Sequence, residues 1–284
     1  MTSIREYYRT VTARLAAALS SQGEAAAAVS IIFEDVAGYS KTFIFANGDR
    51  EITDSMQSRI KSVADRVVAG EPVQYAVGKA RFMGNDFIVT PDVLIPRPET
   101  AGLVDMIVDR WGGRSDLDVC DVGTGSGCIA ISLARALPFC RVTAIDVSAA
   151  AIAVARLNAA SLKVNIDFVE ADILTAVPPR GLYDIIVSNP PYVTQSESAD
   201  MDARVLDYEP GAALFVPDDD PLRFYRAIAA YGRAALKSGG MLYFEINQNF
   251  PDQTVALLES KGFIDVAARR DFKGNYRYVS AVQP

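Results

Sequence analysis

Six consecutive residues carry the most specific chemical pattern in this sequence: Val187-Ser188-Asn189-Pro190-Pro191-Tyr192. An amide or aromatic amine nitrogen delocalises its lone pair into a π system and is therefore a weak nucleophile. To react, that nitrogen must be held in line with its electrophile, and groups that accept hydrogen bonds from its N–H bonds make its lone pair more available. The side-chain oxygen of Asn189 and the main-chain carbonyl of Pro190 are suited to accept two N–H bonds. The prolines, including Pro191, fix the backbone, and Tyr192 offers a flat face to a planar group. Such positioning lowers the activation barrier by about 7 to 11 kcal/mol in favourable cases, so that no strong base is needed. The motif therefore predicts an acceptor site for a planar nitrogen.

A glycine-rich segment precedes that motif and predicts a cofactor site. The predicted strand Leu117 to Val122 runs into Gly123-Thr124-Gly125-Ser126-Gly127 and then into a helix. An open α/β sheet holds nucleotide-like ligands at such a turn, although glycine-rich turns also occur for packing. The dinucleotide fingerprint would require glycine where this sequence has Cys128, whereas the tighter spacing matches enzymes that use S-adenosylmethionine. The segment therefore predicts S-adenosylmethionine as the cofactor.

Two acidic residues follow the next two predicted strands. Asp146 is placed to accept hydrogen bonds from both ribose hydroxyls of an adenosyl group, and the alternative role of helix cap suits Ser148 better. Asp172 is placed to accept from the adenine amino group while Ile173 packs on the ring, and a plain surface turn explains this pair equally well. Asn189 is assigned to the cofactor site as well as to the acceptor site. An ordinary Asn-Pro turn would not explain why all these features occur in the order that one site requires.

The bulk composition restricts the chemistry and the partners. The 284 residues carry a formal net charge of -7, which gives little general attraction for phosphate backbones or anionic lipid. The absence of histidine excludes Ser-His-Asp and Cys-His nucleophiles. Three cysteines, Cys120, Cys128 and Cys140, lack the paired spacing of a zinc cluster, so no metal site is expected. No apolar run is long enough to cross a bilayer, and a cytoplasmic protein with no membrane or direct nucleic-acid partner is the expectation.

The elements that must position these residues form two kinds of region. Apolar spacing predicts amino-terminal helices over Ile4 to Leu19, Ala25 to Asp35 and Met56 to Val67, followed by a hairpin around Gly84-Asn85-Asp86. Pro91, Pro96 and Pro98 then predict extended chain.

From Leu117 onward, strands and helices alternate, which implies a parallel sheet covered by helices. The predicted strands are Leu117 to Val122, Arg141 to Ile145, Ile166 to Val169, Tyr183 to Val187 and Met241 to Ile246. The predicted helices are Cys128 to Ala136, Ser148 to Ala160, Pro221 to Leu236 and Pro251 to Lys261. The tail from Phe263 to Val282 predicts a final antiparallel pair around Lys273-Gly274-Asn275.

Together these motifs resemble the peptide chain release factor glutamine methyltransferase family. The resemblance runs from Gly70 to the carboxyl terminus and includes Gly70-Glu71-Pro72-Val73-Gln74-Tyr75-Ala76-Val77-Gly78, Phe82-Met83-Gly84 and Val93-Leu94-Ile95-Pro96-Arg97-Pro98-Glu99-Thr100. It implies methylation of the glutamine in the Gly-Gly-Gln motif of release factors, with the Val93 to Thr100 segment beside the site. It also implies an α/β fold, in which a Rossmann-like seven-stranded methyltransferase sheet is joined by a linking β-hairpin to a small N-terminal helical domain. A monomer is expected.

The resemblance divides the chain into three parts. Residues 1–78 are expected to form an N-terminal helical substrate-recognition domain, residues 79–100 a linker hairpin with an extended segment, and residues 101–284 the S-adenosylmethionine-dependent methyltransferase domain. The sequence departs from the family pattern where Ile173 stands for an aromatic residue, at Phe215 to Asp220, and where Asn247 stands for a glycine. The last two departures are expected not to touch the reaction centre.

Three alternatives remain open from sequence. The same Asn-Pro-Pro-Tyr chemistry suits the exocyclic amine of adenine in nucleic acid, but that substrate usually needs base extrusion and basic contacts to phosphates. A ribosomal-protein glutamine methyltransferase would share most of the catalytic half and differ around Ile95 to Thr100. A catalytically silent cofactor-binding module is disfavoured by the intact motif at Asn189 to Tyr192.

Overall fold

The computed structural model describes residues 2–284, and the chain divides into two compact units. One unit contains the chain up to Lys79 together with Asp202–Tyr208, and the other contains Ala80–Met201 and Glu209–Pro284. Among residues 2–284, no helix combines the length and the apolar character that crossing a bilayer requires.

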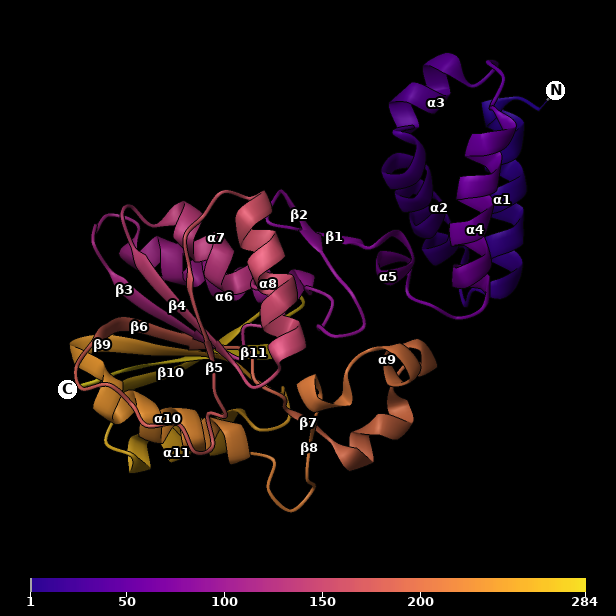
Figure 1. The fold of residues 1–284 in the computed structure, drawn as a ribbon. Coiled ribbons are helices and arrows are strands. Elements are labelled where there is room, and N and C mark those ends of the chain that lie inside the picture. The colour runs from indigo at the N-terminus through magenta and orange to yellow at the C-terminus, as the bar shows by residue number, and fades with distance from the viewer. Residues whose placement is uncertain (1) are drawn as a thin grey trace. The chain divides into compact units, whose positions relative to one another are not determined.

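The first unit is helical (Figure 1). Its helices are α1 (Ile4–Ala18), α2 (Gln22–Ala37), α3 (Lys41–Asn47), α4 (Asp54–Val68), α5 (Val73–Val77) and α9 (Ala203–Tyr208). Side chains of Ser3, Ser21, Ser40 and Thr53 cap the first four of these helices by accepting a main-chain N–H in the first turn. Leu15, Ile32, Phe33 and Ile60 are fully buried between the helices. The three predicted amino-terminal helices are therefore confirmed as α1, α2 and α4.

Helix α9 joins this unit from a distant part of the sequence. The guanidinium of Arg204 forms ion pairs with Glu24 of α2 and with Asp202. The hydroxyl of Tyr208 donates to the main-chain carbonyl of Ala69, at 3.4 Å. The chain thus leaves the second unit after Met201 and returns to it at Glu209, which the sequence did not predict.

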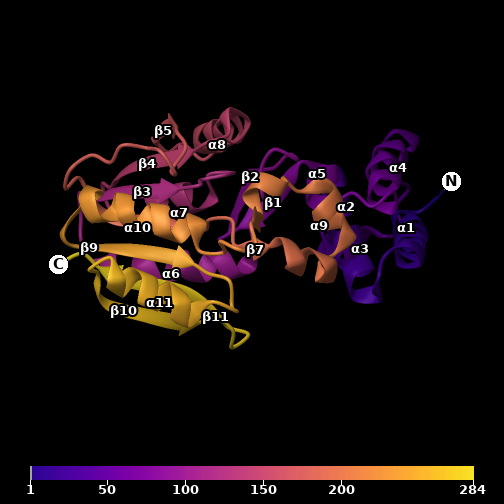
Figure 2. The ribbon, with the colours of Figure 1, turned by 90° about the horizontal axis from the view of Figure 1, so that it is seen from below.

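The second unit is built on a seven-stranded sheet with the order β10-β11-β9-β6-β3-β4-β5. Its strands are β3 (Asp118–Val122), β4 (Arg141–Asp146), β5 (Asp167–Glu170), β6 (Tyr183–Ser188), β9 (Leu236–Glu245), β10 (Ile264–Arg270) and β11 (Tyr276–Val282). Figure 2 shows them across the sheet from β5 to β10 and β11. β11 runs antiparallel to both β9 and β10, and the other pairs are parallel.

Helices cover both faces of that sheet (Figure 1). Helices α6 (Pro98–Trp111), α7 (Cys128–Ala136) and α8 (Ala149–Ser161) lie on one face, and α10 (Arg223–Ala235) and α11 (Pro251–Ser260) lie on the other. Because side chains alternate along a strand, Val119 packs under α6 and α7 while Cys120 packs under α10. The hairpin is β1 (Lys79–Phe82) with β2 (Asn85–Ile88), and β7 (Val193–Thr194) pairs with β8 (Phe215–Val216). The predicted fold class is confirmed.

One prediction about the segment before the sheet is wrong. Pro98 does not keep the chain extended, because it is the first residue of α6. Proline is tolerated there since the first N–H groups of a helix have no partner within the helix. The predicted strands and helices from residue 117 onward are present with small shifts, the largest at β9, which begins at Leu236 rather than Met241.

Candidate active site

The predicted motifs meet at the carboxyl ends of three neighbouring strands. β3 pairs with β6 and β4 on its two sides, so Val122 lies opposite both Ser188 and Ile145. The Ser188 hydroxyl donates to the carbonyl of Val122 at 2.7 Å and ties the two strand ends together. From β3 the sheet continues to β4 and β5 on one side and to β6 and β9 on the other, so the strand order reverses between β3 and β6. Open α/β sheets bind ligands at such a reversal.

The glycine segment forms the turn between β3 and α7. Gly123 and Gly125 have positive φ angles of 73° and 54°, and a Cβ atom built on either would meet no atom within 4 Å. Their backbone therefore faces open space that a ligand can approach closely. Gly127 also has a positive φ, but a Cβ there would lie 3.2 Å from the Cβ of Ala155, so this glycine serves the packing of α7 against α8.

Asp146 is held in place by main-chain groups. Its Oδ2 accepts from the N–H of Gly125 at 2.8 Å, and its Oδ1 accepts from the N–H of Ser148 at 2.9 Å. Ser148 is the N-cap of α8, as predicted, since its hydroxyl accepts from the N–H of Ala151 at 3.1 Å. Each carboxylate oxygen has a second lone pair, so Asp146 can still accept hydrogen bonds from a ligand.

Asp172 and Ile173 follow β5 on the same side of the sheet. Oδ1 of Asp172 accepts from the N–H of Leu174 at 2.9 Å, which makes a tight turn, and the residue is exposed. Ile173 is half-buried and packs against the core beneath α10. The turn and a ligand-binding role for Asp172 are therefore compatible.

One pocket collects most of the predicted site residues. Those that line it are Gly123, Thr124, Gly125, Ser126, Asp146, Asp172, Ile173, Asn189, Pro190 and Pro191. Gly127 and Tyr192 were predicted but do not line it. The segment that the resemblance placed beside the site contributes Val93, Leu94, Pro96, Arg97 and Thr100. Phe224 and Ile228 of α10 form an apolar wall that was not predicted, because the sequence predicted a helix there without a role at the site.

Buried Asp121 lies behind the glycine turn. Its Oδ2 accepts from the Thr124 hydroxyl at 2.7 Å and from the N–H of Ala130 at 3.1 Å, while its Oδ1 has no hydrogen-bond partner. Burial raises the pKa of Asp121 to about 7, and the charge of Asp146 adds to the effect. The sequence placed Asp121 next to the site but gave it no function.

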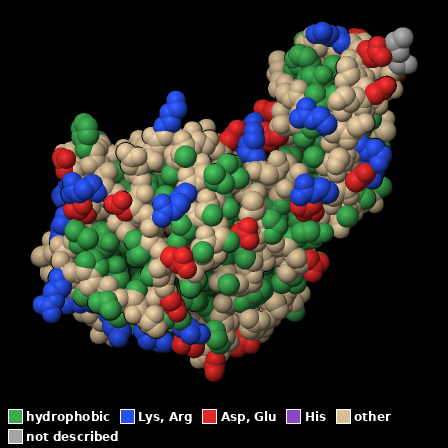
Figure 3. Space-filling view, in the orientation of Figure 1, with side chains coloured by type: hydrophobic (Ala, Val, Ile, Leu, Met, Phe, Trp, Pro, Cys, Tyr) green, Lys and Arg blue, Asp and Glu red, His purple; other side chains and the backbone are tan. Residues whose placement is uncertain are grey.

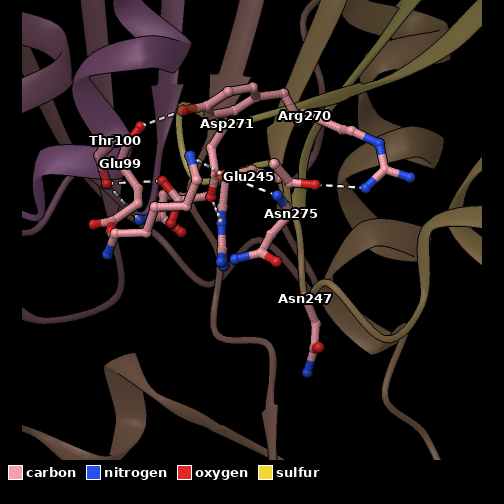
Figure 4. A network of polar contacts seen from close by, with 12 residues as sticks. Glu99, Thr100, Glu245, Asn247, Arg270, Asp271 and Asn275 are labelled. Atoms are coloured by element: carbon pink, nitrogen blue, oxygen red, sulfur yellow. Dashed lines mark hydrogen bonds and ion pairs between the residues drawn. The ribbon is translucent and has the colours of Figure 1, made fainter.

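The acceptor motif is held by side chains from α6 and β9. The Asn189 amide donates to Oγ1 of Thr100 at 3.3 Å, and the Tyr192 hydroxyl donates to Oε1 of Glu245 at 3.1 Å. Thr100 itself donates to Oε2 of Glu245 at 2.7 Å (Figure 4). Glu245 is 1% exposed, and this burial raises its pKa. These contacts were not predicted.

Asn247 corrects one expectation from sequence. Its side-chain amide donates to the main-chain carbonyl of Tyr192 at 3.0 Å and to Glu197 at 2.9 Å. Asn247, which was expected not to touch the reaction centre, therefore contacts the acceptor motif, contrary to the prediction. A glycine would have no side chain to make these bonds.

A half-buried ion pair, in which only the carboxylate is fully buried, joins two pocket-lining segments. Oε1 of Glu209 pairs with Nη2 of Arg97 at 2.5 Å, and its Oε2 accepts from the N–H of Ile95 at 3.2 Å. The Glu209 side chain is 1% exposed. This pair fixes the residues before α6 to the loop that contains Pro210 and Ala212, which also line the pocket.

Comparison with known proteins identifies the fold and the family of the chain. The family model described as the PrmC N-terminal domain matches residues 6–78, and the one described as the methyltransferase small domain matches residues 100–207. The crystal structure of a methyltransferase from Pyrococcus furiosus shares the fold, with a TM-score of 0.52 and 17% identity over 77% of this chain and 96% of that one.

Two curated relatives extend the match to nearly the whole chain. A release factor glutamine methyltransferase from Bacteroides thetaiotaomicron is 46% identical and covers 87% of this chain and 88% of its own length. One from Flavobacterium psychrophilum is 39% identical over 96% of each chain. With the pocket at the ends of β3, β4 and β6, these matches show that the chain belongs to the release factor glutamine methyltransferase family.

Proposed function

We propose that this protein transfers a methyl group from S-adenosylmethionine to the side-chain amide nitrogen of a glutamine in peptide chain release factors, the glutamine of their Gly-Gly-Gln motif. The observation that carries the proposal is the single pocket in which the glycine turn, Asp146 and the Asn189 motif meet. The curated relatives bear the name of this activity. When bound, S-adenosylmethionine supplies an electrophilic methyl group on a sulfonium centre.

The cofactor half of the pocket is assigned to the turn and the two acids. The backbone of Gly123 and Gly125 gives close approach, and the Asp146 carboxylate accepts from the ribose hydroxyls. Asp172 accepts from the adenine amino group, and Ile173 packs against the ring. Thr124 and Ser126 line the same space, while Gly127 supports the turn through the packing of α7 against α8.

The acceptor half is assigned to the motif after β6. Oδ1 of Asn189 and the carbonyl of Pro190 accept the two N–H bonds of the glutamine amide, so its nitrogen is held and its lone pair becomes more available. Pro191 fixes the turn, and Tyr192 supports it from behind through Glu245. The acceptor nitrogen gains a methyl group and releases one proton to water. No imidazole base is needed, and the sequence contains no histidine.

The helical unit is assigned to recognition of the release factor. It matches the PrmC N-terminal domain, and α9 connects it covalently to the loop that follows the acceptor motif. Basic and acidic side chains are interspersed on the face drawn in Figure 3, and the net charge is -7, which favours a protein acceptor over adenine in nucleic acid. A cytoplasmic monomer completes the proposal.

A methyl-transfer assay tests this function. S-adenosylmethionine labelled on its methyl group is incubated with the enzyme and with a release factor, with a copy whose motif glutamine is changed, and separately with DNA, RNA and ribosomal proteins. We expect label on the release factor and none on the changed copy. Label on nucleic acid or ribosomal protein alone would overturn the proposal.

Asn189→Ala tests the acceptor contact within the same assay. The loss of one preorganised hydrogen-bonding group of this kind costs about 10²- to 10³-fold in turnover. We expect that loss in kcat together with cofactor binding close to wild type by calorimetry, because the removed group contacts the acceptor. Cofactor binding abolished along with turnover would contradict the assigned role.

A further inference from the structure

Glu245 is a buried carboxyl group that the assigned chemistry does not use. It ends β9, next to β6, and lies behind the acceptor motif. Both of its oxygens accept from hydroxyl groups, one from Thr100 on α6 and one from Tyr192. Figure 4 shows Thr100 and Glu245 joined in this way inside the second unit.

The hydroxyl of Thr100 connects that carboxylate to Asn189. An ionised carboxylate can only accept hydrogen bonds, and a threonine hydroxyl has one proton to donate. At 2.7 Å from Oε2 of Glu245, the proton of Thr100 is committed to the carboxylate. Toward Asn189, at 3.3 Å, Thr100 can therefore only accept, and the group that faces it must be the amide NH₂.

This order of donors fixes which end of the Asn189 amide remains for the substrate. With the NH₂ turned to Thr100, Oδ1 is the end left for the acceptor. An amide turned the other way would present N–H groups to the N–H groups of the glutamine. We propose that Glu245 and Thr100 are positioning residues that set the direction of the Asn189 amide and thereby make it an acceptor of substrate N–H bonds. The inference rests on the proposed function, since it explains how the same site selects a planar N–H donor.

Protonation of Glu245 would reverse this order. A carboxylic acid can donate to Thr100, whose own proton then points to Asn189 and favours the turned amide. The groups around Glu245 are Glu99 and Thr100 on α6, Cys128 on α7, Tyr192 after β6, Tyr225 on α10, and Arg277 and Tyr278 on β11. Of these, Arg277 carries a positive charge and is paired with Asp271, and Glu99 is paired with Lys273.

The consequence is an acid limb in the pH profile of kcat, which means that kcat falls as the pH is lowered. Burial raises the pKa of Glu245 above its ordinary value, against the opposing effect of Thr100, Tyr192 and Arg277. As the pH falls, Glu245 thus gains a proton at a pH above the usual glutamate pKa of about 4.3. We expect kcat at saturating cofactor and release factor to fall there, while the Kd for the cofactor stays unchanged.

Four variants test the inference. Thr100→Val removes the hydroxyl with little change of volume. We expect its kcat to fall about tenfold or more while the cofactor Kd stays unchanged. The pH profile of its kcat should also lack the acid limb seen in the wild type. Thr100→Ser restores the hydroxyl and should recover most of the turnover together with the limb. Glu245→Gln removes the titrating group, and its kcat should no longer fall in the same pH range. Thr254→Val is the matched control, because Thr254 is fully buried in α11 and donates to Phe250 away from the pocket, so its turnover and pH profile should match wild type.

Two results would overturn the inference while leaving the proposed function intact. One is an active wild-type enzyme whose Thr100→Val variant keeps wild-type kcat. The other is an acid limb that persists unchanged in Glu245→Gln, which decides the question even if Thr100→Val does not fold. A wild-type enzyme that fails to methylate release factors would instead refute the proposed function itself.

Discussion

Asp121 shows how a single buried group makes the stability of the protein depend on pH. Its pKa is raised to about 7, whereas an aspartate in an unfolded chain has a pKa near 3.9. Between these values the folded state holds a proton that the unfolded state has released. The resulting stability is fully present below about pH 4 and is lost as the pH rises through 7.

Asp121→Asn should remove this dependence. One amide oxygen can accept from Thr124 and Ala130 as Oδ2 does, and the NH₂ takes the place of the oxygen that has no partner. From pH 6 to pH 8 the unfolding free energy of the wild type should fall, relative to that of the variant, by about 1.4 kcal/mol. This is the linkage value for one proton that binds with a pKa of 7. Urea unfolding of both cofactor-free proteins at the two pH values measures this difference. Equal changes of unfolding free energy with pH in the two proteins would show that Asp121 does not titrate in this range.

At the scale of elements, the turn between β3 and α7 contains glycines with different tasks. Gly125 faces open space in the pocket, whereas Gly127 packs against Ala155 of α8 and Ile131 of α7. Both have positive φ, so any other residue is strained at either position. The difference between them therefore lies in what the added side chain meets.

Alanine substitutions separate the two tasks. Gly127→Ala pushes a Cβ to 3.1 Å from Cδ1 of Ile131 and should lower the unfolding free energy by about 2 kcal/mol or more, the sum of strain and overpacking. Gly125→Ala pays the strain alone and should chiefly weaken cofactor binding. Chemical unfolding and calorimetry on both variants measure these effects. Equal losses of stability with equal affinities would show that the packing of α7 against α8 does not depend on Gly127.

Helix α6 connects the packed core of the second unit to the pocket. It begins at Pro98, which fixes the first turn and places Thr100 at the pocket and against Glu245. Farther along, Leu103, Ile107 and Trp111 anchor the helix in the core under β9. A positioning residue on a firmly packed helix keeps its geometry better than one on a loop.

At the scale of the whole molecule, each unit has its own apolar core. The single tryptophan, Trp111, lies in the second unit, where its Nε1 donates to the Tyr243 hydroxyl at 2.8 Å. Its fluorescence therefore follows the unit that contains the pocket, while far-ultraviolet circular dichroism follows the helices of both units.

Cofactor binding should stabilise the unit that Trp111 reports. At a free concentration of 100 times its Kd, S-adenosylmethionine adds about 2.7 kcal/mol, which corresponds to roughly 5 to 10 °C in Tm for a unit of this size. We expect that shift in the Trp111 melting curve, and a much smaller one in Asp146→Ala. A Trp111 transition that does not respond to the cofactor would place the binding site outside the second unit.

The local parts of this protein follow from its amino-acid sequence alone. The glycine turn and the Asn189 motif each follow a strand directly and Asp146 ends one, so the strand pattern sufficed to bring them to one sheet edge. The helix that begins at Pro98 also has a local signal, since Leu103, Ile107 and Trp111 follow at helical spacing. The prolines before it favour extended chain, which is why the prediction at Pro98 is wrong. Residue types and spacing predict such parts because propensity and capping act within a few residues.

The support of the acceptor motif, by contrast, depends on how distant elements pack together. Thr100 and Glu245 are 145 residues apart and meet because β9 lies beside β6 and α6 packs on β9. The attachment of α9 to the helical unit and the bond from Asn247 to Tyr192 likewise depend on which elements become neighbours. A hydrogen bond between distant residues needs donor and acceptor within about 3 Å, and strand order and helix packing set that distance while local preference leaves it open.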